Sequence, residues 1–200
     1  MKGPRLTRLQ QIQTPYGAME AEWTSQGLYR CEFQSRSAVP PLGLVVDQPP
    51  VSDQARREGE SEENPLSQPA TVHQARLGLE KWLATYFETG VLQWEIDWFD
   101  WSGVSPFHRK ALTVCFEIPS GQVLTYGEVA SRCGSPQAAR AVGGAMARNR
   151  WPLIIPCHRV MGAGGQLTGY SGSGGVDTKQ ALLSFERERA ASSRRNGSDH

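Results

Sequence analysis

The sequence lacks several features that would place it in a specialised class of protein. Among its 200 residues no stretch approaches the roughly 18–20 apolar residues that span a bilayer. The N-terminus develops no apolar run ahead of a cleavage site. Hydrophobic residues make up 38% of the chain and charged residues 20%, which excludes collagen, a coiled coil and a fully disordered chain. We therefore expect a cytoplasmic protein with a packed core and no membrane partner.

Cysteine and histidine are few and scattered. The 4 cysteines form no Cys-x-x-Cys pair, and the 4 histidines are as widely spaced. This spacing argues against a zinc ribbon and against a disulfide framework. We expect reduced thiols, no metal and no cofactor.

The net charge of +1 conceals an uneven distribution. Residues 1–100 carry 9 basic and 14 acidic side chains, whereas residues 101–200 carry 12 and 6. From Val129 to Val176 there is no Asp or Glu, and a surface without carboxylates can approach phosphates without repulsion. A nucleic-acid surface and a solvated basic loop region both remain open. The arginines of this stretch are Arg132, Arg140, Arg148, Arg150 and Arg159.

The first half of the chain indicates a small β-rich unit interrupted by a polar segment. Apolar and polar residues alternate over 12–33 around a Pro-Tyr-Gly turn signal. Over 47–73 prolines and charged residues replace large apolar ones, so we expect a disordered insertion or linker. A helix is expected over 74–87, where apolar residues recur at helical spacing, and an extended segment over 94–101.

The second half predicts a pair of short helices after a longer one. A helical stripe begins at Pro106 and stops at Pro119. Thr125, with Glu128 three residues later, forms a capping box for the next helix. Two helices joined by a short glycine-containing turn are typical of a helix-turn-helix motif, and they are also common as ordinary packing units.

The second helix of this pair is expected to have Ser135 as its N-cap and to run to about Arg148. Its two adjacent glycines cost about 1 kcal/mol each relative to alanine, so close approach of another surface must offset the loss. A neighbouring helix and a nucleic-acid groove are both candidates. Arg140 lies about 200° around the helix from the core residue Val142 and would protrude.

Cys157 and His158 are the most reactive neighbouring pair in the sequence. They follow a short apolar run bounded by prolines. A cysteine in such a place is commonly an inert core residue, whereas an adjacent base favours the nucleophilic thiolate. Because neighbours in sequence do not face each other on a helix, His158 would act as a base through a bridging water.

Several motifs around this pair resemble one known family. The run IPCHRV (155–160), preceded by ARAVGGA (139–145) and followed by TGYSG (168–172), is similar to the methylated-DNA–protein-cysteine methyltransferases, also called O6-alkylguanine-DNA alkyltransferases. The resemblance is dense over 107–186 and weak at 14–17.

The resemblance implies an α/β (α+β) fold in two domains. A small β-rich, ribonuclease-H-like domain would occupy 1–100. A helical, winged-helix-like domain with the helix-turn-helix motif, DNA binding and catalysis would occupy 101–190, followed by a polar tail over 191–200.

The resemblance also implies a role for each matching residue. Cys157 would accept the alkyl group, His158 would be the water-mediated base, and Glu186 would orient the imidazole. Asn149 would buttress the turn before the cysteine, and Tyr126 would donate a proton toward the leaving guanine.

DNA contact and base recognition are assigned in the same way. Arg140 would enter the base stack in place of the flipped nucleotide. The other implied DNA-binding residues are Ala138, Ala139, Ala141 and Gly143. The implied pocket residues are Val160, Tyr170 and Ser171.

The function implied is direct DNA repair by a monomer that reacts once. The alkyl group of O6-methylguanine, and of O4-methylthymine, would pass from double-stranded DNA to Cys157, with the duplex bound in its minor groove and the nucleotide flipped. The protein would act in the cytoplasm, at the nucleoid in a bacterium, or in the nucleus of a eukaryote.

Some alternatives remain open. Glu188 could replace Glu186 as the partner of His158, and Tyr126 could be a packing residue. The glycine-rich segment 171–175 is longer than the usual family loop, which bears on the alkyl groups accepted. A lesion binder without transfer, a cysteine hydrolase that uses Cys157 and a plain DNA-binding regulator are the competing functions.

Overall fold

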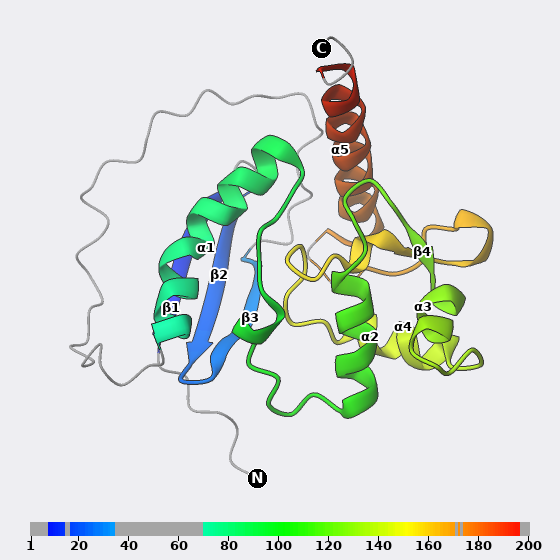
Figure 1. Ribbon diagram of the computed structural model, residues 1–200, viewed down its shortest axis with the longest axis horizontal. Coiled ribbons are helices and arrows are strands. Elements are labelled where there is room, and N and C mark those ends of the chain that lie inside the picture. Colours follow the sequence, from blue (N-terminus) through cyan, green and yellow to red (C-terminus); the bar gives the residue numbers. More distant parts are fainter. Residues whose placement is uncertain (1–7, 15–16, 35–69, 171, 173, 197–200) are drawn as a thin grey trace.

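The described chain consists of a strand-rich N-terminal part followed by a helical C-terminal part (Figure 1). The computed structural model describes residues 8–14, 17–34, 70–170, 172 and 174–196. The N-terminal part contains β1 (Arg8–Thr14), β2 (Gly17–Thr24), β3 (Gly27–Phe33) and α1 (Ala70–Thr89). The C-terminal part contains α2 (Pro106–Phe116), β4 (Leu124–Thr125), α3 (Tyr126–Arg132), α4 (Ala139–Ala147), β5 (Val160–Met161) and α5 (Gly175–Asn196). Short 3-10 helices are η3 (Ile96–Trp98), η4 (Cys157–Arg159) and η5 (Ala163–Gly165). The mixed α/β architecture is as expected.

The three N-terminal strands form one antiparallel sheet in the order β1-β2-β3. Alternate residues of β2, Met19, Ala21 and Trp23, are fully buried, because successive side chains of a strand point to opposite faces. Helix α1 packs against β1 and β3 and lies over one face of the sheet in Figure 1. The face of α1 that is fully buried consists of Ala75, Leu79, Leu83 and Tyr86.

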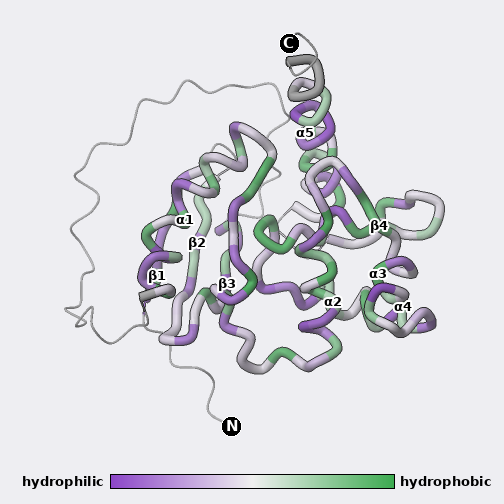
Figure 2. Tube along the Cα trace, in the orientation of Figure 1, coloured by the Kyte–Doolittle hydropathy of each residue, from purple (hydrophilic) through white to green (hydrophobic). Residues whose placement is uncertain are grey.

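Strand β3 joins the sheet to the C-terminal part. The backbone N–H of Cys31 donates to the carbonyl of Arg150 at 2.9 Å, and the indole of Trp151 donates to the carbonyl of Leu28 at 2.8 Å. Gly27 lets the segment before α2 approach the start of β3, since its φ is +144° and a Cβ there would lie 2.5 Å from the carbonyl oxygen of Trp98. The apolar loop that follows Arg150 lies between β3 and α2 and is largely green in Figure 2.

Several boundaries predicted from the sequence differ from the structure. The segment 94–101 is not extended throughout, because Ile96–Trp98 turns as η3 with the N–H of Trp98 donating to the carbonyl of Glu95. The expected insertion 47–73 lies outside the described residues except for 70–73, which form the first turn of α1 with Val72 buried. The expected tail over 191–200 begins inside α5, which continues to Asn196.

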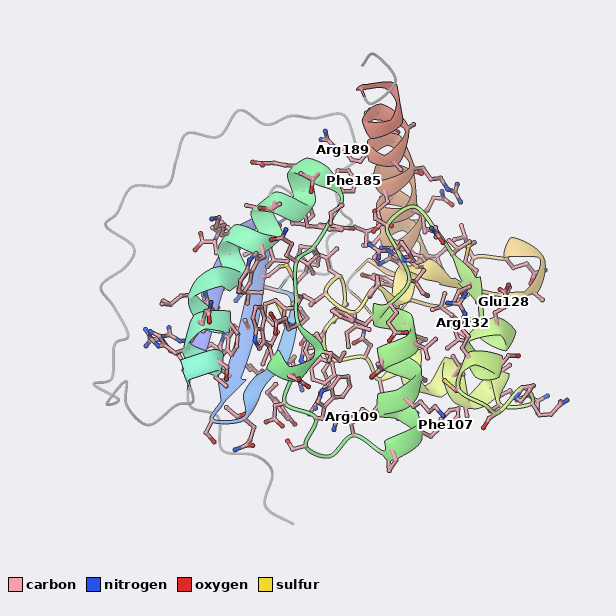
Figure 3. All side chains as sticks on the ribbon, viewed as in Figure 1. Phe107, Arg109, Glu128, Arg132, Phe185 and Arg189 are labelled. Carbon is pink, nitrogen blue, oxygen red and sulfur yellow. The ribbon has the colours of Figure 1, made fainter. Side chains whose placement is uncertain are left out.

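Helices α3 and α4 form the expected helix-turn-helix. The capping box is present: the Thr125 hydroxyl accepts from the N–H of Glu128, whose carboxylate accepts from the N–H of Thr125. Figure 3 shows Glu128 and Arg132 on this short helix. Helix α2 begins at Pro106 with Ser105 as its N-cap.

The expected start of α4 at Ser135 is wrong, because this residue completes the end of α3. Its N–H donates to the carbonyl of Ala130, and the N–H of Gly134, whose φ is +72°, donates to the carbonyl of Ser131. These two bonds are a Schellman motif. The next residues then form a turn in which the N–H of Ala138 donates to the carbonyl of Ser135. Helix α4 therefore begins at Ala139, with no side-chain cap.

Among the described residues no helix combines the length and the apolar character needed to cross a bilayer.

Candidate active site

Cys157 lies at the wall of a cavity of about 180 Å³. Its side chain is nearly buried, with a relative exposure of 4%. The cavity lies between the helix-turn-helix and the loop that precedes α5. Its lining residues are Tyr126, Gly143, Met146, Ala147, Cys157, Gly169 and Tyr170.

The turn between α4 and Cys157 is held by the side chain of Asn149. The amide of Asn149 donates to the carbonyl of Ile155 at 2.9 Å, and its oxygen accepts the N–H of Trp151 at 3.0 Å. Within this turn Leu153 has a φ of 76°, a left-handed conformation that is unusual for a residue other than glycine. The side chain of Asn149 thus bridges the two ends of a strained turn that leads to the cysteine.

His158 lies beside Cys157 in η4 and is fully buried. Its Nε2 is 2.8 Å from Oε1 of Glu186, so Nε2 carries the proton and Nδ1 presents a lone pair. Nδ1 is buried and has no hydrogen-bond partner among the described residues. Burial lowers the pKa of His158 below its usual 6.5 and outweighs the opposing effect of Glu186. The imidazole is therefore neutral near pH 7 and can accept a proton.

Glu186 is ionised although it is fully buried. Burial alone would raise its pKa, but the hydrogen bonds from His158 and then Arg159, together with the charge of Arg159, hold that pKa well below its usual value. The N–H of Gly121 also donates to Oε2 at 3.2 Å. Glu188, the open alternative, is exposed, so the structure brings Glu186 and not Glu188 to His158.

Two of the five arginines in the basic stretch are not available for phosphate. Arg159 is 7% exposed and donates through Nε and Nη2 to Glu186, with Nη2 2.7 Å from Oε1. Arg150 lies over the rings of Tyr29 and Trp151 and donates to the carbonyl of Asp100. The basic stretch therefore presents fewer arginines for phosphate contact than its composition indicates, because these two guanidinium groups are engaged in tertiary contacts.

The remaining arginines are exposed on the helix-turn-helix. Arg132 is on α3, Arg140 on α4 and Arg148 at the end of α4. Ala141, next to Arg140, is exposed, whereas Gly143 is half-buried and lines the cavity. Ala138 and Ala139 at the start of α4 are half-buried.

The two glycines of α4, Gly143 and Gly144, lie next to different side chains. A Cβ at Gly143 would lie 4.0 Å from the ring of Tyr126, so this glycine borders the cavity. A Cβ at Gly144 would lie 3.2 Å from the guanidinium of Arg148, which donates to the carbonyl of Gly144. Neither glycine meets a neighbouring helix backbone within 4 Å.

Of the pocket residues predicted from the sequence, Val160, Tyr170 and Ser171, only Tyr170 lines the cavity among the described residues. The buried hydroxyl of Tyr170 has no hydrogen-bond partner among the described residues, and Tyr126 is close enough to accept from Thr168 at 3.4 Å. Val160 is buried and does not line the cavity, and its carbonyl accepts from Lys179 at 2.6 Å. Ser171 lies outside the described residues.

Sequence reasoning missed three buried polar residues around this site: Tyr86, Arg159 and Lys179. The ammonium of Lys179 donates to the carbonyls of Val160 and Thr168, at 2.6 and 3.0 Å. A signal for Lys179 exists, since it lies seven residues before Glu186 and thus on the same apolar face of α5. No comparable signal connects Tyr86 with Glu186, which is 100 residues away.

Comparison with known proteins agrees with this arrangement. The family model for "6-O-methylguanine DNA methyltransferase, DNA binding domain" matches residues 106–188. A methylated-DNA–protein-cysteine methyltransferase of Mycolicibacterium paratuberculosis is 36% identical over 163 residues, which cover 80% of this chain and 96% of that protein. The protein of the same name from Mycobacterium bovis is 42% identical over 108 residues, covering 54% of this chain and 63% of that protein.

A solved structure shares the fold as well. The crystal structure of Mycobacterium tuberculosis OGT in complex with DNA superposes with a TM-score of 0.61 and 27% identity, over 90% of this chain and 92% of that chain. The similarity therefore extends beyond the helix-turn-helix into the strand-rich part. The chain belongs to the methylated-DNA–protein-cysteine methyltransferase family.

Proposed function

We propose that Cys157 is the residue that accepts the alkyl group in this repair reaction. The family transfers a methyl group from methylated DNA to a protein cysteine. Among the described residues Cys157 is the one cysteine that lines the cavity, and His158 follows it in η4 with its Nε2 2.8 Å from Glu186. The combination of a thiol at the cavity wall with an adjacent neutral imidazole that is paired with a buried carboxylate carries the proposal.

The proton of the thiol passes to Nδ1 of His158 through a bridging water. Nδ1 is the basic nitrogen because Nε2 is held by Glu186, and the charged Glu186 stabilises the imidazolium that forms. The buried ammonium of Lys179 favours negative charge on the sulfur. The result is a thiolate at the cavity wall.

The sulfur then displaces the purine oxygen from the alkyl carbon. A C–S bond forms, the C–O bond breaks, and its electron pair leaves with guanine, which takes up a proton. Tyr126 lines the cavity and is the proposed proton donor. Because a thioether is not hydrolysed by a water-activating histidine, each molecule reacts once.

DNA would reach this cavity through the exposed face of α4. The target atom is inside the duplex, so the nucleotide must be flipped out, and Arg140 would fill the space it leaves. Ala138, Ala139, Ala141 and Gly143 would allow the backbone of α4 to approach a minor groove. The unpartnered hydroxyl of Tyr170 supports its role as a donor to the flipped base.

Further parts of the proposal concern the whole chain. We also infer a ribonuclease-H-like domain over 1–100 and a winged-helix-like domain over 101–190. The three-stranded antiparallel sheet under α1 and the β4–β5 pair beside α3 support them. The same proposal includes a monomeric state, repair of O4-methylthymine, base contact by Ser171 and action in the compartment that holds the DNA.

Intact-mass spectrometry tests the transfer. Incubation with a duplex that contains O6-methylguanine is expected to add one methyl group to the protein, located on Cys157 by peptide mapping. Cys157→Ala should gain no mass, while Cys115→Ala, which removes a buried thiol outside the cavity lining, should still be methylated. Tight lesion binding by an unmodified wild-type protein would refute the assignment, and so would multiple turnover.

A further inference from the structure

The carboxylate of Glu186 receives a hydrogen bond from the N-terminal part of the molecule. The hydroxyl of Tyr86, in α1, donates to Oε1 of Glu186 at 2.8 Å. This is the same oxygen that lies 2.8 Å from Nε2 of His158. All three side chains are fully buried, so water neither competes for these hydrogen bonds nor screens them.

Tyr86 acts on this carboxylate as a donor. Burial, and then the charge of Glu186, raises the pKa of Tyr86 well above its usual value of 10.0. The phenol therefore keeps its proton throughout the physiological range. An ionised carboxylate is an acceptor only, so the hydrogen bond has one direction.

Several donors compete for this carboxylate. Arg159 of η4 donates to both oxygens, the N–H of Gly121 donates to Oε2, and Tyr86 and His158 share Oε1. The other ionisable groups coupled to Glu186 or His158 are the ammonium of Lys179 on α5 and the neutral phenol of Tyr170 in the loop before it. Each hydrogen bond to the carboxylate disperses negative charge that would otherwise stabilise a protonated His158.

We infer that Tyr86 is a positioning residue for the proposed alkyl transfer, because its hydroxyl fixes Oε1 of Glu186 and limits the basicity that Glu186 confers on His158. This inference rests on the function proposed above. It assigns the N-terminal part a direct place in the proton-transfer network, through α1, in addition to the backbone contacts of β3 with the turn before Cys157.

The substitution Tyr86→Phe separates this role from packing. The centroid of the Tyr86 ring lies 5.3 Å from that of Phe87 and 5.7 Å from that of Phe185. A phenylalanine at position 86 keeps both ring contacts. Glu186 retains Arg159 as a charged partner. Only the hydroxyl is lost, so the carboxylate should stabilise the imidazolium more strongly.

The test is the pH dependence of the single-turnover rate constant at saturating O6-methylguanine duplex. Tyr86→Phe is expected to move the midpoint of the acid limb to higher pH by about half a unit, as the loss of one buried hydrogen bond implies. Tyr29→Phe is the matched control, because Tyr29 lies in β3 under Arg150 and should leave the midpoint unchanged. An unchanged or lowered midpoint in Tyr86→Phe would overturn the inference, regardless of any change in the maximal rate constant.

A second variant covers the case in which Tyr86→Phe does not fold. 3-Fluorotyrosine at position 86 has a more acidic hydroxyl and is a stronger donor, so the midpoint should move to lower pH. A midpoint that stays in place or rises contradicts the inference. If wild-type protein gains no methyl group on Cys157, the proposed function fails; if it does and the profiles coincide, only the role of Tyr86 fails.

Discussion

At the scale of single residues, Arg159 shows how far a side chain can depart from the role that its charge indicates. Its guanidinium is buried against Glu186 and also donates to the carbonyl of Ile118. A charge buried in this way is costly when its partner is removed. Arg159 is therefore part of the support of the candidate site and not of the DNA surface.

Replacement of Arg159 should destabilise the fold. Arg159→Ala leaves Glu186 without its charged partner, so the free energy of unfolding should fall by about 3–5 kcal/mol. Urea denaturation measures this change. The exposed Arg148→Ala is the control and should change stability by no more than about 0.5 kcal/mol; a comparable loss in the two variants would contradict the assignment of Arg159.

The residues proposed for the reaction stand out in the sequence, whereas the contacts made by the residues that support them do not. Cys157, His158 and Glu186 stand in motifs of recognisable type and spacing. Arg159 stands in the same motif, but its partner depends on how α5 packs against η4. Lys179 satisfies backbone carbonyls that have no sequence signature. Local sequence patterns therefore predict the reactive residues better than they predict which polar side chains are buried.

Among the helices, a boundary is predictable where local contacts determine it and is not predictable where two local arrangements compete. The capping box of α3 was predictable because Thr125 and Glu128 satisfy each other locally. The start of α4 was not, because Ser135 can cap the next helix or close the previous one, and the Schellman motif decides for the latter. The expected protrusion of Arg140 from α4 survives this shift, since the residue remains inside the helix and exposed.

Arg140→Ala should impair transfer from duplex DNA in particular. Without a side chain to occupy the vacated stack, the flipped state loses at least about 1.4 kcal/mol, or tenfold in rate. Single-turnover kinetics with methylated duplex and with the free base O6-benzylguanine separate the steps, because the free base needs no flipping. Arg187→Ala on α5 is the matched exposed control. Equal losses on duplex and free base would contradict a role in flipping.

At the scale of the whole molecule, the buried network couples folding to pH. His158 has a pKa below its usual 6.5 when folded, so below about pH 6.5 the unfolded chain binds a proton that the folded chain does not. Glu186 has a pKa held below its usual 4.5, so the unfolded chain also takes up its proton more readily below about pH 4.5. Both groups therefore make the folded state less stable as pH falls.

Acidification from pH 7 to pH 5 should accordingly lower the melting temperature, with His158 contributing at most about 1.4 kcal/mol per pH unit. Differential scanning calorimetry across this range measures the slope. His158→Gln removes the titrating group and should flatten the dependence, whereas His108→Gln, at a partly exposed position on α2, should retain the wild-type slope. A parallel slope in wild type and His158→Gln would show that another group controls the acid response and that folding does not lower the pKa of His158.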